Sequence, residues 1–367
     1  MRLTTKHNFL NRIAVILVAS MMFFGSVGSS MAQTGGTSTF QFLDFVNSAR
    51  SEAVGGYLIT IKDNDATLGV RNPALINKEM HGMLAFNYVN YFADTRLGFT
   101  SYARHFKNVG TFTGTLLYAN YGQFEYADIN GERNGSSFSA NDLALNVGYG
   151  YEIDSNFSIG ASFKFGASFL ESYNAFGVAG DLAAHYQKKS KGFGAALLIR
   201  NVGLQLNSYV ANNREAVPFN VLLSMSKKLE HAPFRFSLTY QDLHRWNVIY
   251  FDPNQAPETD PLTGDLIVAE APSFGNKLMR HLIFSGEMIL SENFHFRFGY
   301  NYKKRIENKV AIKPGLTGIS WGFGLKVKKF HLSYALSKSH LAGTSNHITM
   351  TTRIGKPASE DTFYRQD

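Results

Sequence analysis

The 367-residue chain has no cysteine and only nine prolines and two tryptophans. Without cysteine, disulfides, thiol chemistry and cysteine-based metal sites are excluded, so an exported form must rely on backbone hydrogen bonds and packing. No run after residue 32 approaches the ~18 apolar residues of a membrane-spanning helix. What the chain has instead is 31 Phe, 18 Tyr and 33 Gly at a slightly negative mean hydropathy of −0.14. Strands with one lipid-facing and one lumen-facing side give this composition.

Residues 1–32 match the three-part pattern of a secretory signal peptide. A basic start precedes an apolar run over 13–24, and the small residues Ser30 and Ala32 predict cleavage before Gln33. The alternative, an uncleaved anchor, is disfavoured because the apolar run is short. Removal of the signal takes away three basic and no acidic residues, which leaves a formal charge of 33 minus 28, or +5. A charge this mild indicates no nucleic-acid partner.

Apolar and polar residues alternate with a period of two along many segments, as in strands with two different faces. In the segment 157–169, Phe, Ile and Ala alternate with Ser, Gly and Lys, and the segments 143–153 and 294–302 follow the same rule. The polar face of a soluble sandwich would carry long charged residues. Here it is rich in Gly and Ser, which fits a crowded lumen.

We count about fourteen such segments, each near the ten residues that a tilted transmembrane strand needs. They are expected at 83–92, 95–106, 111–122, 141–153, 157–169, 175–188, 193–202, 218–229, 234–243, 279–290, 294–304, 318–328, 330–338 and 346–355. Every second connection is short, and those between, such as 123–140 and 244–278, are mostly longer. Short periplasmic turns and long outer loops are typical of outer-membrane barrels, and they place both termini in the periplasm.

The predicted fold class is therefore all-β, a transmembrane antiparallel β-barrel in the cell outer membrane. We expect four parts: a signal peptide over 1–32, a pre-barrel or plug segment over 33–82, the barrel over 83–355, and a polar C-terminal tail over 356–367. The segment 40–80 lacks strand alternation, and it either plugs the lumen or lies in the periplasm.

No catalytic residue, cofactor or metal site is predicted, and we expect no enzyme. Ser224 and Lys227 match a Ser-x-x-Lys motif, but that chemistry needs a helical turn, whereas positions i and i+3 of a strand point to opposite faces. Asp63 and Asp65 could suggest calcium, but no further ligand pattern follows, so a turn is favoured. The eleven histidines show no metal-binding spacing.

Glu287 and Arg297 form the best-grounded pair of charges. A three-residue turn around Glu292 would place them opposite each other on the inner face of adjacent strands, where opposite charges stabilise modestly. We interpret the pair as a structural salt bridge of the lumen and not as a transport site.

Several stretches resemble the FadL-like outer-membrane barrels. Those near the N-terminus are Phe42-Leu43-Asp44-Phe45, Ser48-Ala49-Arg50, Gly55-Gly56 and Asn72-Pro73-Ala74-Leu75. More narrowly, the chain resembles the PorQ family of the Bacteroidetes type IX secretion system. The run His231-Ala232-Pro233-Phe234-Arg235-Phe236 and the strand with Arg280-His281 and Gly286-Glu287 are the more specific motifs, and the resemblance covers residues 40–350.

The PorQ resemblance implies a fourteen-stranded barrel in a cell-surface attachment complex. There the barrel would hold a PorZ-like surface protein and would act indirectly with the PorU sortase and the PorV barrel. As a scaffold it would contact outer-membrane lipid, and we expect no small-molecule ligand. The wider FadL group implies the alternative, a transporter of hydrophobic compounds, which requires an apolar pocket leading from the lumen to the outside.

The longest connection, 244–278, is the expected partner contact, with Trp246, Tyr250 and Phe251 as candidate anchors, because aromatic residues are enriched at interface centres. The competing interpretation assigns these aromatics to the outer girdle at the membrane surface. The sequence does not decide between the two.

Overall fold

A computed structural model describes residues 39–91, 93–128, 130–209, 214–249, 273–308, 316–340 and 343–356. The predicted signal peptide, the tail beyond residue 356, and two of the candidate anchors, Tyr250 and Phe251, lie outside these residues. None of the helices found in the described ranges is both long and apolar enough to cross a membrane.

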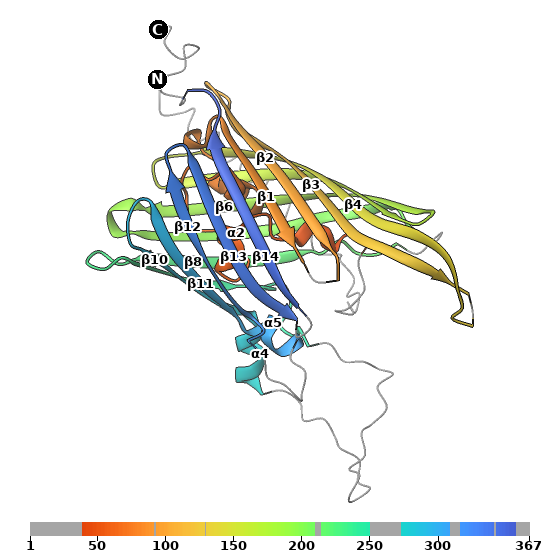
Figure 1. The fold of residues 1–367 in the computed structure, drawn as a ribbon. Helices are drawn as coiled ribbons and strands as arrows, with labels where there is room; N and C mark the ends of the chain where they lie inside the picture. Colours follow the sequence, from red (N-terminus) through yellow and green to blue (C-terminus); the bar gives the residue numbers. More distant parts are fainter. Residues whose placement is uncertain are drawn as a thin grey trace, which may run out of the picture. The chain divides into compact units, whose positions relative to one another are not determined.

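The described residues form a closed barrel of fourteen antiparallel strands, in which β1 pairs with both β2 and β14 (Figure 1). The strands are β1 Met83–Asn90, β2 Arg96–Phe106, β3 Gly110–Ala127, β4 Arg133–Glu152, β5 Phe157–Leu170, β6 Tyr173–Lys188, β7 Phe193–Asn207, β8 Asn220–Lys228, β9 Phe234–Tyr240, β10 Leu282–Ile289, β11 Phe294–Asn301, β12 Ile319–Val327, β13 Phe330–His340 and β14 Gly343–Arg353. Each overlaps a predicted segment, so the predicted fold class is confirmed.

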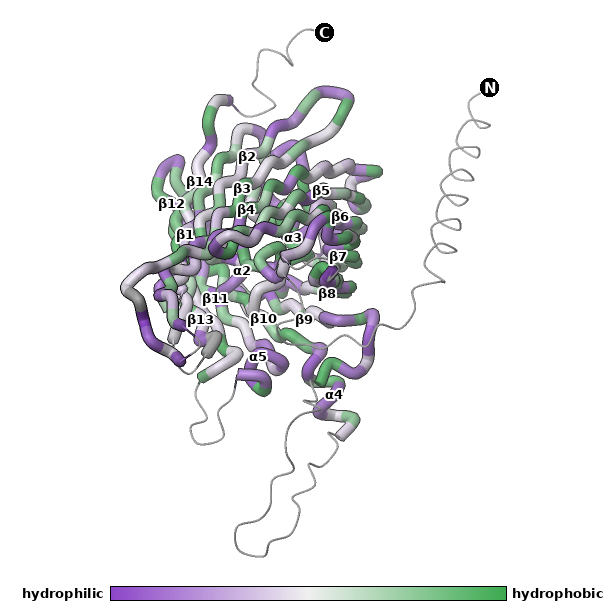
Figure 2. Tube along the Cα trace, turned by 90° about the vertical axis from the view of Figure 1, so that its right-hand side faces the viewer, coloured by the Kyte–Doolittle hydropathy of each residue, from purple (hydrophilic) through white to green (hydrophobic). Residues whose placement is uncertain are grey.

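The apolar face of the strands lies outside and the polar face inside. On β5, Phe163 is 57% exposed whereas its neighbour Lys164 is 3% exposed. Apolar and polar positions alternate along the strands in Figure 2. Leaving a Phe or Leu side chain in water instead of burying it costs roughly 1.5–3 kcal/mol. An exterior made of many such residues is therefore stable in hydrocarbon, and the barrel has the architecture of an outer-membrane protein.

The hairpin of β3 and β4 is longer than predicted. We expected a loop over 123–140, but the strands continue pairing as far as Ala127 and Arg133, with register shifts after Asn120 and Glu125. Phe124 stacks on Phe138 with ring centroids 5.4 Å apart. These bulges interrupt the alternation of apolar and polar residues, so the alternation does not predict that the two strands continue beyond residue 122.

Two predicted strand ends are helices. The prediction of strand at 279–281 is wrong because helix α4 spans Phe274–His281, and that at 302–304 is wrong because helix α5 spans Tyr302–Glu307. Ser273 and Asn301 begin these helices as N-caps, since their side chains accept hydrogen bonds from the first-turn amides of Asn276 and Lys304. Ser273 and Asn301, as residues that favour helix N-caps, are the sequence signal for these two helices.

Residues 39–82 lie inside the barrel, and we call them the plug. Figure 1 shows the plug within the ring of strands. Its elements are η2 Gln41–Asp44, α2 Ala49–Ala53, α3 Ala66–Arg71, η3 Pro73–Leu75 and η4 Lys78–Met80. Wall side chains hold its backbone: Ser158 Oγ donates to Ala74 O at 2.8 Å, and Ser285 Oγ donates to Val54 O at 2.7 Å. The small polar residues of the inner face therefore serve as hydrogen-bond partners of the plug.

Glycines of the wall allow the plug backbone to approach closely. A Cβ added at Gly160 of β5 would lie 2.2 Å from the carbonyl carbon of Pro73, and one added at Gly299 of β11 would lie 2.2 Å from the amide nitrogen of Gly55. No ordinary side chain fits at either position.

Gly160→Val should displace the plug without breaking the barrel. We expect a loss of ~1–3 kcal/mol, the usual effect of overpacking, because the added methyl groups meet fixed backbone. Protease accessibility of the plug and the thermal midpoint on heated gels measure the effect. Gly114→Val is the matched control, since nothing lies within 4 Å of a Cβ at Gly114. Equal behaviour of the two variants would contradict the proposed contact.

Candidate functional site

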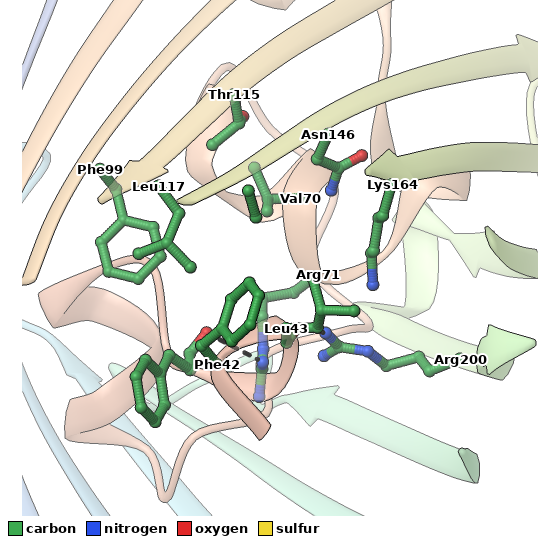
Figure 3. A pocket seen from close by; sticks show the side chains of 12 residues that line it. Phe42, Leu43, Val70, Arg71, Phe99, Thr115, Leu117, Asn146, Lys164 and Arg200 are labelled. Carbon is green, nitrogen blue, oxygen red and sulfur yellow. Dashed lines mark hydrogen bonds between the residues drawn. The ribbon is translucent and has the colours of Figure 1, made fainter. Parts of the chain in front are cut away.

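A small pocket lies between the plug and the wall (Figure 3). Its volume is about 30 Å³. The lining residues come from the plug and from strands β2, β3, β4, β5 and β7; they are Phe42, Leu43, Phe45, Val70, Arg71, Phe99, Thr115, Leu117, Ala144, Asn146, Lys164 and Arg200. This pocket combines an apolar side with a cationic side.

The apolar side belongs to a larger buried cluster in the lumen. It joins Phe42 and Leu43 of η2 to Phe99 of β2 and Leu117 of β3. The other members are Phe40, Val89, Leu97, Ala119, Ala144, Ala175, Ala179 and Val217. Most of the wall members lie near the barrel end that holds the longer connections. A barrel lumen is usually polar, so this apolar end departs from the pattern of a water-filled pore.

The cationic side consists of Arg71 of α3, Lys164 of β5 and Arg200 of β7, which point into the same region in Figure 3. Arg71 donates to Gly56 O at 2.8 Å and lies over the Tyr57 ring, 4.4 Å from its centroid. These contacts hold the guanidinium of Arg71 at the boundary between plug and wall.

Two carboxylates face the three cations. Lys164 Nζ lies 2.7 Å from Asp181 of β6, whereas Arg71 and Arg200 both lie farther from Asp44, at 3.5 and 3.4 Å. Burial and repulsion from Arg200 lower the pKa of Arg71.

Three positive and two negative side chains leave this cluster with an excess of +1. Arg200 is 1% exposed; within the described residues its Nε has no hydrogen-bond partner, and its Nη1 has only the 3.4 Å ion-pair contact with Asp44. The site can therefore accept a further lone pair, such as that of a water, a hydroxyl or a carboxylate, beside an apolar surface.

Glu287 of β10 is the centre of a second charged cluster. It pairs in register with Arg297 of β11, and Arg297 Nε lies 2.8 Å from its carboxylate. Arg235 of β9 also lies 2.8 Å away, and Arg50 of the plug lies 4.0 Å away. Turn length and alternation were sufficient to pair Glu287 with Arg297. The contribution of Arg50 depends on the tertiary fold.

Asp63 and Asp65 serve the plug itself. Both form ion pairs with Arg50, at 2.7 and 3.3 Å. Asp65 also caps α3 by accepting from the amide of Thr67. Across the described ranges, no group of three or more His, Asp or Glu side chains is placed to bind a metal.

The Ser-x-x-Lys motif is divided between the two faces of β8. Ser224 is buried, and its hydroxyl forms a hydrogen bond with the hydroxyl of Thr239 at 2.7 Å. Lys227, in contrast, is exposed on the outside of the barrel. The hydroxyl and the amine therefore do not meet, as the strand geometry requires.

Trp246, the candidate anchor within the described residues, lies at the barrel end that carries α4 and α5. Its ring contacts Phe274, with centroids 5.2 Å apart, and stacks on His281 at 5.5 Å. Phe274 is 71% exposed. Asp242 pairs with Lys303 at 2.8 Å and so ties the β9–β10 connection to α5. We call Trp246, Phe274 and the exposed surface of α4 and α5 the rim patch.

Glu52 of the plug pairs with Lys304 of α5 at 3.6 Å, so the attachment of the plug to the barrel depends on the ionisation of Glu52. Burial raises its pKa, but attraction to Lys304 and His347 outweighs burial and lowers the pKa from 4.5 to about 2. A lowered carboxylate pKa stabilises the folded state above pH 4.5, and this contribution is lost as the pH falls towards 2.

Plug protection against protease should therefore fall between pH 4.5 and 2, after correction for the activity of the acid protease used. Glu52→Gln should remove this part of the pH dependence. If the wild type and Glu52→Gln show the same acid profile, Glu52 does not cause it.

Comparison with known proteins gives similarities of architecture. No protein-family model matches the chain, and no curated protein matches it. Among solved structures, the CymD monoaromatic hydrocarbon channel is 12% identical, with 86% of this chain and 99% of that chain covered and a TM-score of 0.48. The Pseudomonas putida toluene transporter TodX is 13% identical over 87% and 98%, with a TM-score of 0.47. A Pseudomonas aeruginosa FadL homologue is 9% identical over 84% and 98%, with a TM-score of 0.45. At identities this low, the similarity does not assign a function. A function has to be argued from the residues of this chain.

Proposed function

We propose that this protein is an outer-membrane conduit for hydrophobic compounds, with the plug as its gate. The observation that carries the proposal is the apolar cluster in the lumen, which ends at the pocket between Phe42, Phe99 and Leu117. We further propose that the longer connections face the outside and the short turns face the periplasm, as is typical of outer-membrane barrels. The proposal of a conduit places transport before the scaffold role and departs from the expectation that the protein has no small-molecule ligand.

The small volume of the pocket fits a gate that is closed in this structure. A volume of about 30 Å³ holds one or two water molecules and no larger compound. Five of the lining residues belong to the plug, so a shift of the plug away from β2 and β3 would enlarge the pocket. Binding of an apolar molecule would recover the hydrophobic free energy of its buried surface and offset the plug contacts that are lost.

A disulfide between plug and wall tests the gate. Ala53 of α2 and Ala335 of β13 lie in one buried cluster of alanines. Because the natural chain has no cysteine, Ala53→Cys with Ala335→Cys would introduce the only thiols. In proteoliposomes we expect the oxidised double variant to stop uptake of a labelled alkane or monoaromatic compound, and a reductant to restore it.

Each single cysteine variant is a control that should retain uptake under oxidising conditions. Uptake by the wild type that does not exceed that of empty liposomes would overturn the transport proposal. Unchanged uptake by the locked barrel would show instead that the plug does not need to move at this position.

The PorQ-type role is a second candidate, and the rim patch is the observation that favours it. Trp246 and Phe274 form an exposed aromatic pair. The same connection and helices carry the partly exposed basic residues Arg245, Lys277, Lys303 and Arg305, against one exposed acidic residue, Glu307. Aromatic anchors within a charged rim are typical of protein interfaces. The partner would be a PorZ-like surface protein, with the PorU sortase and the PorV barrel as indirect partners in type IX secretion.

Affinity purification from native membranes tests this second role. Trp246→Ala with Phe274→Ala should reduce recovery of a PorZ-like protein at least about tenfold, as expected when two interface anchors are lost. Phe330→Ala with Leu332→Ala, on the outer face of β13 near the other end of the barrel, is the matched control. If the same proteins are recovered with the wild type and the rim variant, the rim patch is not the contact.

A further inference from the structure

An apolar groove follows the outer face of the barrel across β8, β9 and β10. Its volume is about 320 Å³, within the range of small-molecule sites, ~300–1,000 Å³. Its apolar lining consists of Phe193, Met225, Phe236, Leu238, Phe284 and Phe298. Unlike the pocket in the lumen, this groove faces the region that the membrane occupies.

Strand register explains why a groove forms here. Lys227 of β8, Phe236 of β9, Gly286 of β10 and Phe298 of β11 follow one another in a single outward row. Gly286 has no side chain in this row, and the Phe298 ring lies over it, 2.3 Å from where a Cβ would be. Because the Phe298 ring lies over Gly286, the space beside Phe284, two residues earlier on β10, stays open.

Lysines gather at one end of the groove. Lys227 lines it, and Lys227 Nζ donates to the carbonyl of Lys191 in the β6–β7 turn. Lys228 N donates to Gly192 O in the same turn at 2.8 Å, so the β6–β7 and β8–β9 turns lie side by side. Five exposed lysines occur on these turns, Lys188, Lys189, Lys191, Lys227 and Lys228, against one carboxylate, Glu230. The local charge is therefore five minus one, or +4.

We propose that the groove binds an acyl chain of an anionic glycerophospholipid, whose phosphate lies against Lys191 and Lys227. The apolar lining fits a hydrocarbon chain, and the lysines stand where a strand end meets the headgroup region. Basic clusters at this depth attract anionic lipids. Because the short turns mark the periplasmic end, the lipid belongs to the periplasmic leaflet. The proposal depends on membrane placement of the barrel and is independent of transport.

Native mass spectrometry of the full-length protein in detergent tests this site. Dioleoylphosphatidylglycerol and dioleoylphosphatidylcholine are added separately at equal concentration. We expect the wild type to retain one phosphatidylglycerol in preference to phosphatidylcholine. Replacing Lys191 and Lys227 together by Gln should lower the affinity for phosphatidylglycerol by roughly 10- to 30-fold and remove the preference.

Two further variants separate the site from general charge effects. K328Q with K329Q removes the same charge from the β12–β13 turn, away from the groove, and should keep the preference. Gly286→Leu should force the Phe298 ring into the groove and reduce retention of both lipids. Equal retention of the two lipids by the wild type would overturn the proposal, as would an equal loss in both lysine variants.

Discussion

Deletion of residues 40–80 should convert a closed barrel into an open pore. The inner wall is lined by Ser, Thr, Asn and charged side chains, and some of them, such as Ser158 and Ser285, donate hydrogen bonds to the plug backbone. Without the plug these groups must bond to water, so the lumen should fill and conduct ions. In planar bilayers we expect the full-length protein to give no steady current and the deletion variant to give resolvable single-channel steps.

The strands close on themselves through the pairing of β1 with β14, which does not involve the plug, so the deleted protein should still form a barrel. Migration as a compact species on unheated gels checks this. A folded deletion variant with no current would mean that the wall residues collapse into the lumen. A steady current through the full-length protein would mean that the plug does not seal it.

Glu287→Gln should destabilise the protein by ~3–5 kcal/mol, the usual effect of removing one partner from a buried ion pair. The variant leaves Arg297 and Arg235, each 2.8 Å from the carboxylate, without their counterion, and it weakens the hold of the wall on Arg50. Glu287 is 3% exposed, so water cannot replace the lost interaction without entering the lumen.

Thermal and denaturant unfolding of the purified barrel measure this effect. Glu230→Gln, at an exposed turn, is the matched control and should change stability by less than ~1 kcal/mol. The double variant Glu287→Gln with Arg297→Gln should recover part of the loss, because it removes one of the uncompensated charges. If Glu287→Gln is as stable as Glu230→Gln, the cluster does not fasten the plug to the wall.

The two experiments distinguish two roles of the plug. Deletion asks whether the plug closes the lumen, and Glu287→Gln asks how firmly it is attached. In a conduit, the plug closes the lumen and is held to the wall by contacts that ligand binding can overcome. In a scaffold, the plug closes the lumen and stays attached to the wall. Uptake by the wild type decides between these roles, and the lock formed by Ala53→Cys and Ala335→Cys shows whether uptake requires movement of the plug.

The sequence by itself determined the barrel. Alternation along segments such as 157–169 is a local property, since neighbouring residues of a strand must point to opposite faces, and so it predicted strand positions and which face meets lipid. Alternation with turn length also brought Glu287 opposite Arg297. Where local pairing becomes irregular, as in the β3–β4 extension, or where a cap begins a helix, as at Ser273, the same rule failed.

Only the tertiary structure decided what lies inside the barrel. The plug has no repeating pattern, because its residues meet wall residues up to 300 positions away, such as the Ala49 amide with Thr349. The pocket likewise joins Arg71, Lys164 and Arg200 from three distant segments. The groove on the outer face depends on strand register, which aligns Lys227, Gly286 and Phe298 across four strands. Long-range contacts of this kind leave no periodic trace in the sequence, because they are set by the closure of the barrel around its plug.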